Sequence, residues 1–362
     1  MRVIMTGGGT GGHVYPAIAI AEKIQEKYPD SEILFIGTER GMEHKIVPQN
    51  GYEIRFITIS GFDRKHMLKN AKTAVNLVKG TLQSRAILKE FRPDVVIGTG
   101  GYVCAPVVRT AAKMGILTFI HEQNAYPGMT NKLLEKYADR VFLAFPEAAK
   151  YFKKKEKLII TGNPVRKAFR EANKETARTL LSIPQDAFVV LAFGGSLGAG
   201  RINKAALPLL EFAAGQKGLC MVLATGSYYY RKMTEKAQEK HLDHADNIRI
   251  LEYIDDMPNY LAAADLVISR AGALTVSEIA AGGKPAILIP SPNVTGNHQF
   301  YNAKSIADKG AAVLIEEPDL TDESLISSVL SLMNDREKLG AMAKASKAAA
   351  AKDALGEIVS YL

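Results

Sequence analysis

The sequence predicts an α/β protein made of two Rossmann-like domains, each built around a parallel sheet. Three observations predict this fold class. Strand-like apolar runs alternate with helical patterns along the chain, the pattern restarts near residue 188, and glycine-rich turns follow three of the strands. Alternating strands and helices are typical of parallel sheets that helices cover on both faces. A chain of 362 residues is long enough for two such domains, each with its own core.

Seven short apolar segments of the first half are expected to form one sheet. They cover residues 2–6, 33–36, 54–58, 95–98, 117–120, 141–144 and 158–160. Six further segments predict a second sheet, at residues 188–193, 219–224, 248–251, 266–269, 286–289 and 312–315, and helices follow Thr321. Runs of this length that are rich in Val and Ile are typical of strands. Gly162-Asn163-Pro164 ends the first set and marks the boundary between the domains.

Composition narrows the class of protein. Cys104 and Cys220 lie far apart and have no partner at metal-site spacing, so we expect a reducing compartment and neither a disulfide nor a zinc site. No apolar run reaches the roughly 18 residues of a membrane span, and glycines interrupt the first apolar segment too early for a signal peptide. The sequence therefore predicts a cytoplasmic protein.

Positive charge is concentrated in the first half. The net charge is +8, with 24 Lys and Arg against 15 Asp and Glu up to Val165, and 22 against 23 beyond it. Such a bias indicates an anionic partner, either a membrane surface or nucleic acid, or else a basic face that is only solvated. Charge alone favours the solvated face.

Residues 66–92 predict a long amphipathic helix within this basic half. Apolar residues such as Val75, Val78 and Leu82 lie beside basic ones such as Lys79 and Arg85. Packing of one helix face on the sheet explains most of the pattern, and a peripheral contact with an anionic membrane is the alternative.

Glycine-rich turns follow three predicted strands, at residues 7–12, 98–101 and 194–200. Glycines let the backbone approach a ligand closely, and the start of the following helix adds positive potential, so such turns bind anions. Three turns at the ligand-binding ends of strands indicate more than one phosphate group. The first turn ends in His13 rather than in the Lys of a P-loop, so we do not expect kinase or ATPase chemistry.

His13 is the candidate general base. At the predicted start of a helix, the helix dipole disfavours the imidazolium and leaves a neutral ring that can accept a proton. A helix-capping or core histidine is the alternative. The segment His121-Glu122-Gln123-Asn124 follows a strand and is too polar for a core. We expect it to order sugar hydroxyls or to support His13, and not to bind a metal, because it does not match the H-E-x-x-H zinc helix.

Two polar segments of the second half also follow strands. Residues 269–278 form a small-residue turn and a helix start, where Thr275 and Glu278 have the spacing of a capping box and Glu278 equally suits a ribose diol. Residues 290–299 form a polar loop in which Gln299 is a candidate sugar contact and Asn297 a candidate helix cap. Two Rossmann-like domains with such turns imply a ligand in the cleft between them.

Together these motifs resemble the UDP-N-acetylglucosamine transferases of peptidoglycan synthesis, the MurG family. The resemblance rests on residues 8–13, 98–102, 121–124, 162–166, 194–196, 272–278 and 298–299, in order along the chain. It implies a GT-B fold, with domains at 1–163 plus 343–362 and at 164–342, whose parallel sheets face an interdomain cleft. It also implies transfer of N-acetylglucosamine from UDP-N-acetylglucosamine to the C4 hydroxyl of the muramoyl sugar of lipid I. Lipid II then forms with inversion, without a cofactor or metal.

The resemblance further implies roles for single residues. His13 is the base, and the acceptor diphosphate meets Gly8, Gly9, Gly100, Gly101 and Tyr102. Donor contacts are implied for Thr10, Gly11, Gly12, Asn124, Arg166, Ser196, Ile254, Gly272, Ala273, Leu274, Thr275, Val276, Ser277, Glu278 and Gln299. Among them, Ser196 lies at the diphosphate, the backbone of Ile254 meets uracil, and Glu278 holds the ribose. The implied partners are UDP-N-acetylglucosamine, lipid I and an anionic membrane surface, without nucleic acid, at the cytoplasmic face of the cell membrane.

Two other functions fit part of this pattern. One is a related transferase that glycosylates diacylglycerol, but the segment of residues 121–124 argues against it. The other is a nucleotide-sugar-binding module without catalysis, against which His13 and Glu278 weigh. Transfer to a lipid I analogue distinguishes the three.

Overall fold

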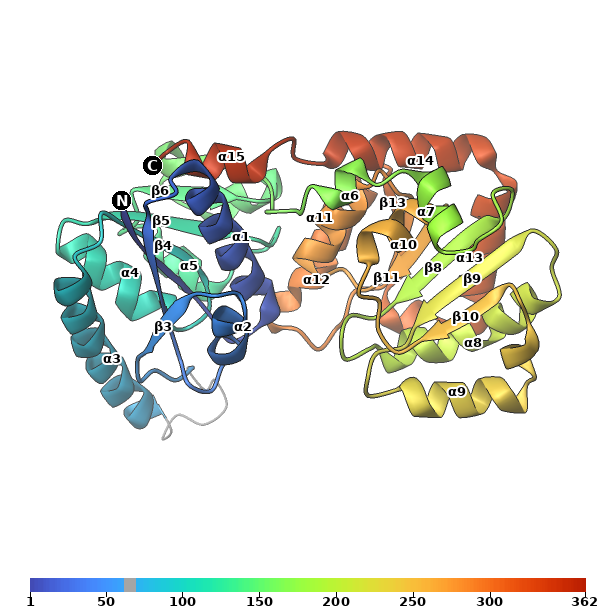
Figure 1. The fold of residues 1–362 in the computed structure, drawn as a ribbon, viewed down its shortest axis with the longest axis horizontal. Coiled ribbons are helices and arrows are strands. Elements are labelled where there is room, and N and C mark those ends of the chain that lie inside the picture. Colours follow the sequence, from blue (N-terminus) through green and yellow to red (C-terminus); the bar gives the residue numbers. More distant parts are fainter. Residues whose placement is uncertain (62–69) are drawn as a thin grey trace. The chain divides into compact units, whose positions relative to one another are not determined.

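The computed structural model describes residues 1–61 and 70–362 and divides the chain into two compact units (Figure 1). Unit 1 comprises Met1–Pro164 and Ala351–Leu362, and unit 2 comprises Val165–Ala350. Each unit is a parallel sheet packed between helices. The predicted fold class is confirmed, and each of the predicted strands is present with its ends shifted by at most two residues.

Unit 1 is built on a seven-stranded parallel sheet in the order β3-β2-β1-β4-β5-β6-β7. The strands are β1 (Arg2–Gly7), β2 (Glu32–Gly37), β3 (Glu53–Phe56), β4 (Val95–Gly100), β5 (Leu117–Glu122), β6 (Arg140–Leu143) and β7 (Leu158–Ile160). Val3, Ile4 and Met5 of β1 are fully buried, as expected for a parallel strand covered on both faces. The strand order reverses between β1 and β4, and ligands of open parallel sheets bind beyond the carboxyl ends of strands at such a point.

The helices of unit 1 cover both faces of this sheet (Figure 1). They are α1 (Gly11–Lys27), α2 (Glu43–Gln49), α3 (Asn70–Phe91), α4 (Cys104–Lys113), α5 (Met129–Leu134) and α15 (Ala354–Val359). The last helix, α15, packs beside α1, and its Ile358 and Val359 join the same core cluster as Ile20 and Phe35. The amphipathic helix predicted over 66–92 is observed as α3, and residues 66–69 lie outside the described part of the chain.

Unit 2 repeats the design with a six-stranded sheet in the order β10-β9-β8-β11-β12-β13. Its strands are β8 (Phe188–Phe193), β9 (Leu219–Ala224), β10 (Ile248–Leu251), β11 (Leu266–Ser269), β12 (Ala286–Leu288) and β13 (Ala312–Leu314). Its helices are α6 (Ala168–Glu171), α7 (Lys174–Leu180), α8 (Gly200–Ala214), α9 (Tyr230–Glu239), α10 (Met257–Ala263), α11 (Ala273–Ala281), α12 (His298–Ala307), α13 (Asp322–Asn334) and α14 (Arg336–Ala349). Here the order reverses between β8 and β11, so the connections after these two strands lie side by side.

Helix α14 belongs to unit 2 along its whole length. Met342 is buried in the core of that unit, and Lys347 Nζ donates a hydrogen bond to the carbonyl of Ala281 at 2.9 Å. The chain therefore returns to unit 1 after α14, at Ala351, whereas the resemblance placed the return at residue 343.

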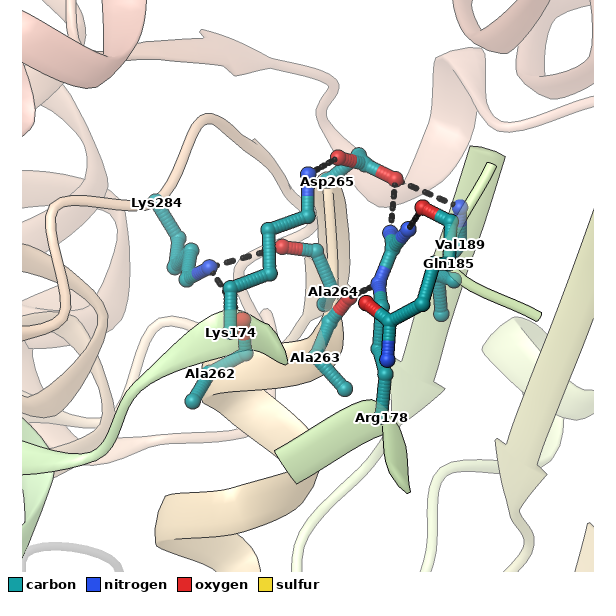
Figure 2. A network of polar contacts seen from close by, with 9 residues as sticks. All are labelled: Lys174, Arg178, Gln185, Val189, Ala262, Ala263, Ala264, Asp265 and Lys284. Carbon is teal, nitrogen blue, oxygen red and sulfur yellow. Dashed lines mark hydrogen bonds and ion pairs between the residues drawn. The ribbon is translucent and has the colours of Figure 1, made fainter. Parts of the chain in front are cut away.

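An ion-pair network around the buried Arg178 lies at the amino ends of β8 and β11, whereas the glycine-rich turn of residues 194–200 follows the carboxyl end of β8. Figure 2 shows the side chains of this network. Asp265 pairs with Lys174 and, at 2.7 Å, with Arg178, and it accepts the backbone N–H of Val189 at 2.8 Å. Arg178 is only 1% exposed and also donates to two backbone carbonyls. Because a buried guanidinium must keep its partners, the network ties α7 to the sheet and is structural.

Candidate active site

The first glycine turn joins β1 to α1 at the point where the strand order of the unit 1 sheet reverses. The side chain of Glu43 holds this turn by hydrogen bonds. Glu43 Oε2 accepts the N–H of Gly9 at 2.9 Å, while Oε1 accepts the N–H and the hydroxyl of Thr38 at 2.9 and 2.7 Å. The Glu43 side chain is 1% exposed and so serves the backbone rather than a ligand. Sequence reasoning missed this residue. The available signal was an acid just after β2, the strand that pairs with β1.

The backbone N–H groups of this turn divide into two sets. The N–H of Gly8 donates to the carbonyl of Gly100 at 3.2 Å, and Gly9 binds Glu43, so both are used within the protein. The N–H groups of Gly11 and Gly12, at the first positions of α1, have no partner within residues 1–61 and 70–362. An anion at this turn therefore meets the N–H groups of Gly11 and Gly12, where the helix dipole adds positive potential.

The second turn, after β4, lies against the first and needs its glycines. Gly100 has φ 114°, and a Cβ there would lie 2.7 Å from Nδ1 of His13. Gly101 has φ 86°, and its Cβ would lie 2.4 Å from the carbonyl oxygen of Gly8. The two turns can therefore pack together only because both positions lack side chains. Tyr102, in the same turn, is 61% exposed.

The structure brings residues 121–124 next to His13, as the sequence predicts. Nδ1 of His13 lies 3.1 Å from Oε1 of Gln123, and Nε2 of Gln123 lies 2.9 Å from Nδ1 of His121. His121 in turn donates from Nε2 to the carbonyl of Gly162 at 3.0 Å. His121 and Gln123 are fully buried, and this burial lowers the pKa of His121 below its usual range. Support of His13 by this segment is thus confirmed.

Glu122 shapes the loop that carries Asn124. Its Oε1 accepts the backbone N–H and the side-chain amide of Asn124, at 3.0 and 3.1 Å. Its Oε2 accepts the N–H of Gly128 at 3.0 Å and the amide of Asn131 at 2.9 Å. Glu122 thus has both oxygens engaged by the loop, and it places the half-buried Asn124 beyond the end of β5.

In unit 2, the third glycine turn follows β8 and precedes α8. Gly198 has φ 81°, and a Cβ there would lie 1.9 Å from the carbonyl oxygen of Thr225, so this close approach of two loops requires glycine. Ser196, in the middle of the turn, is exposed. Ile254, after β10, is 4% exposed, so its side chain belongs to the core and is not a candidate ligand contact.

The connection from β11 to α11 presents Glu278. The N-cap of α11 is Gly272 and has no side-chain cap. Of the two interpretations that the spacing of Thr275 and Glu278 left open, the capping box is therefore wrong, because the helix begins three residues earlier than a Thr275 cap requires. Gly272, Ala273, Leu274, Thr275, Val276 and Ser277 instead form the first turns of the helix, and Glu278 lies in its second turn. Burial raises the pKa of Glu278 to about 7, against the positive charge of Arg166, which lowers it.

Arg270 holds two neighbouring loops of unit 2 together. Its guanidinium donates to the carbonyls of Ile289 and Pro290, both at 3.1 Å, and pairs with Glu317. This role could not be predicted from the sequence, because Arg270 follows β11 whereas Glu317 follows β13.

The loop before α12 is also held from within. Gln299 Oε1 accepts the N–H of Ser291 at 2.8 Å, which leaves its amide nitrogen for a ligand. Asn297 adopts φ 53° and makes no cap hydrogen bond, so the predicted side-chain cap is wrong. His298, the residue before Gln299, has its Nδ1 at 2.9 Å from the carbonyl oxygen of Thr295.

The sequence-predicted residues thus form one group in each unit. Thr10, Gly11, Gly12, His13, Gly100, Gly101, Tyr102 and Asn124 follow the carboxyl ends of β1, β4 and β5. Ser196, Ile254, Gly272–Glu278 and Gln299 follow the carboxyl ends of β8, β10, β11 and β12. Over residues 1–61 and 70–362 there is no cluster of His, Cys, Asp or Glu suited to a metal ion, and no helix long and apolar enough to cross a bilayer.

Comparison with known proteins gives two family matches. The glycosyltransferase family 28 N-terminal domain matches residues 3–143, and the glycosyltransferase family 28 C-terminal domain matches residues 189–358. Similar curated proteins are named UDP-N-acetylglucosamine–N-acetylmuramyl-(pentapeptide) pyrophosphoryl-undecaprenol N-acetylglucosamine transferase. That of Acetivibrio thermocellus is 48% identical over 96% of this chain and 93% of its own length. That of Alkaliphilus oremlandii is 46% identical over 100% and 98%.

Solved structures of the same fold include MurG of Acinetobacter baumannii. It matches with a TM-score of 0.80 at 31% identity, over 99% of this chain and 98% of that one. The UDP-GlcNAc 2-epimerase of Neisseria meningitidis, solved with UDP-GlcNAc bound, matches with a TM-score of 0.70 at 16% identity over 99% of both chains. The second likeness concerns the fold alone.

Proposed function

The chain belongs to glycosyltransferase family 28 and, within it, to the MurG transferases, and on this premise we propose how its residues carry out the reaction. It transfers N-acetylglucosamine from UDP-N-acetylglucosamine to lipid I and forms lipid II in peptidoglycan synthesis. The roles of single residues, the membrane contact and the location are our proposals.

His13 is the general base of a single displacement. The C4 hydroxyl oxygen of the muramoyl sugar forms a bond to C1 of N-acetylglucosamine while the bond from C1 to the diphosphate oxygen breaks. Attack from the opposite face inverts the anomeric configuration, the electron pair leaves with UDP, and Nε2 of His13 takes the hydroxyl proton. The observation that supports this role is the contact between Nδ1 of His13 and Oε1 of Gln123. It orients the His13 ring in the first turn of α1, beside the N–H groups of Gly11 and Gly12.

Unit 2 binds the donor. The turn around Ser196 holds the diphosphate, the backbone of Ile254 binds uracil, and Glu278 accepts the ribose hydroxyls. The N-terminus of α11, at Gly272 and Ala273, stabilises the charge that develops on the departing diphosphate. Arg166, whose charge acts on Glu278, lies near the nucleotide. Gln299 of unit 2 and, from unit 1, Asn124 and Thr10 bind the N-acetylglucosamine.

Unit 1 binds the acceptor. The resemblance implies that Gly8 and Gly9 meet the acceptor diphosphate and that Gly11 and Gly12 contact the donor. Because the N–H groups of Gly8 and Gly9 are used within the protein, we assign the N–H groups of Gly11 and Gly12 to the acceptor diphosphate instead, with Gly8 and Gly9 shaping the turn. Gly100, Gly101 and the exposed Tyr102 line the second turn, so the two turns together hold the diphosphate of lipid I.

An exposed stripe on α3 holds the protein on the membrane as a peripheral protein at the cytoplasmic face. Val75, Val78 and Leu82 share one helix face and are 66%, 63% and 63% exposed. Arg85 and Lys89 continue the same face and are exposed. Apolar side chains followed by basic ones suit the boundary between lipid tails and anionic headgroups.

Vesicle binding tests this stripe. Val78→Glu should weaken sedimentation of the chain with phosphatidylglycerol vesicles by about tenfold, because an apolar contact is lost and a negative charge is placed against the anionic headgroups. Leu180→Glu is the matched control, because Leu180 is 66% exposed but lies on α7 of unit 2. Equal binding of the two variants would remove α3 from the proposal.

Turnover tests the role of His13. With UDP-N-acetylglucosamine and a lipid I analogue, His13→Ala should lower kcat by about 10²- to 10⁴-fold, the usual contribution of a general base, and leave the Kd for the donor within about twofold. His244→Ala, at an exposed histidine of unit 2, is the matched control. Unchanged turnover in His13→Ala removes it as the base. Transfer to diacylglycerol instead of the lipid I analogue would favour the alternative transferase.

A further inference from the structure

A chain of hydrogen bonds leads from Gly162 through the side chains of His121 and Gln123 to His13. The backbone carbonyls of Gly162 and His121 determine which atom donates in each of these bonds. A carbonyl oxygen only accepts, so Nε2 of His121, at 3.0 Å from the oxygen of Gly162, carries a hydrogen. A neutral ring then has its lone pair on Nδ1, and that nitrogen accepts from Nε2 of Gln123 at 2.9 Å. Burial disfavours the charged form of His121 by lowering its pKa, which is consistent with the neutral ring that this step needs.

The amide of Gln123 transmits this direction to His13. Its Nε2 also lies 3.2 Å from the carbonyl oxygen of His121, a second group that only accepts. The nitrogen end of the amide therefore faces His121, and the oxygen end faces His13 at 3.1 Å from Nδ1. Oε1 can only accept, so Nδ1 of His13 carries the hydrogen and Nε2 keeps the lone pair.

These hydrogen bonds, from Gly162 through His121 and Gln123 to His13, form a relay that further hydrogen bonds hold in the core of unit 1. Asn131 donates from its side chain to the carbonyl of His121 at 3.1 Å, and Asn163 donates to the carbonyl of Gln123 at 3.0 Å. Gly100 leaves room for the ring of His13 on its other side. Nε2 of His13 has no hydrogen-bond partner in the described part of the chain, so its lone pair is available.

We propose that His121 and Gln123 are positioning residues that hold His13 in the Nδ1–H tautomer and so keep the lone pair on Nε2, where the acceptor proton is taken. The inference rests on the proposed role of His13 as the base. A free neutral imidazole prefers the Nε2–H tautomer, in which the nitrogen that must accept the proton already carries one. Without the relay, His13 spends most of its time in that inactive form.

Nitrogen NMR of the full chain labelled with ¹⁵N-histidine tests the tautomer directly. At a pH where the rings are neutral, the His13 signals, assigned by their loss in His13→Ala, should show the Nδ1–H form in the wild type. Gln123→Met, which fills the same space without an amide, should shift them toward the Nε2–H form. An Nε2–H form in the wild type, or an unchanged form in Gln123→Met, overturns the proposal.

Kinetics separates positioning from a merely structural role. Gln123→Met should lower kcat by about tenfold or more, with the KM for UDP-N-acetylglucosamine within about twofold, and should cause no further loss in a His13→Ala background. Gln123→Glu keeps an acceptor towards His13 and should recover part of kcat, while Gln238→Met at an exposed glutamine is the matched control. An equal loss in both backgrounds shows a structural role and overturns the proposal. If His13→Ala alone has no effect, the base assignment fails, and the NMR result still decides the tautomer.

Discussion

Glu278 should make donor binding depend on pH. Burial raises its pKa to about 7, whereas an exposed glutamate ionises near 4.5. Ribose hydroxyls donate hydrogen bonds and therefore bind the carboxylate better than the neutral acid. Below pH 7 the free site is mostly protonated and must release its proton when the donor binds. Affinity for UDP-N-acetylglucosamine should therefore rise with pH up to about 7 and then level off.

The size of the effect follows from the fraction of ionised sites. One pH unit below the pKa about a tenth of the carboxyls are ionised, so the Kd at pH 6 should be about tenfold weaker than at pH 8, or ~1.4 kcal/mol. Titration calorimetry with UDP-N-acetylglucosamine measures this, because the donor diphosphate has no group that titrates in the range. In buffers of different ionisation enthalpy, binding should release close to one proton at pH 6 and almost none at pH 8.

Glu278→Gln is the decisive comparison. The amide still accepts a hydroxyl hydrogen bond but cannot ionise, so its Kd should be the same at pH 6 and pH 8. A tenfold dependence that persists in the variant would refute the assignment of the titrating group to Glu278. A flat profile in the wild type would refute the raised pKa.

The same carboxyl couples stability to pH in the opposite direction. Because its pKa is higher in the folded than in the unfolded chain, the stabilisation is complete below about pH 4.5 and is lost as the pH rises through about 7. The loss is at most roughly 3 kcal/mol. Urea unfolding should therefore show Glu278→Gln gaining stability relative to the wild type between pH 5 and pH 8. A constant difference between the two proteins contradicts this reasoning.

Two further changes test the supports of the units. Asp265→Asn leaves Arg178 buried without its charge partner, so urea unfolding should show that the free energy of unfolding falls by about 3–5 kcal/mol. Lys174→Met removes only the more exposed cation of the network and should lower it by less than about 1 kcal/mol. Glu43→Gln places an amide nitrogen against the N–H donor of Gly9 or the donors of Thr38, so we expect a loss of about 1–3 kcal/mol by thermal unfolding together with weaker binding of the acceptor analogue. Wild-type stability in either variant contradicts the role given to that carboxylate.

The fold was predictable because its strands are short, apolar and buried on both faces. Residues 158–160 and 188–193 are strands with the predicted bounds, and the glycine turns lie where a switch point requires them. The capping box considered for Thr275 and Glu278 and the side-chain cap expected at Asn297 are both absent, because a cap depends on the residue at which a helix begins and on the backbone conformation there. α11 begins at Ala273 rather than after Thr275, and the backbone of Asn297 adopts a left-handed conformation.

The sequence suggested that the segment 121–124 supports His13, but not which of its side chains makes the contact. Gln123 is 110 residues from His13, and only the order β1-β4-β5 brings the ends of their strands together. Glu43 contacts Gly9 because β2 pairs with β1, which no spacing along the chain reveals. The sequence therefore predicted which polar and glycine-rich segments follow the strands, whereas the sheet order decides which of their side chains contact one another.

The residues whose roles only the structure defines share one property: each acts on the backbone or on another side chain. Glu43 holds a turn, Glu122 holds a loop, Gln123 orients a ring and Arg270 joins two loops. Buried groups of this kind fix the position of exposed ones before the substrates bind, so the reaction does not have to reorganise the site. Their loss should therefore slow transfer without changing which sugar or lipid is accepted, whereas changes at Glu278 or Gln299 should alter donor affinity first. The effect on kcat, compared with the effect on the KM for UDP-N-acetylglucosamine, separates the two sets.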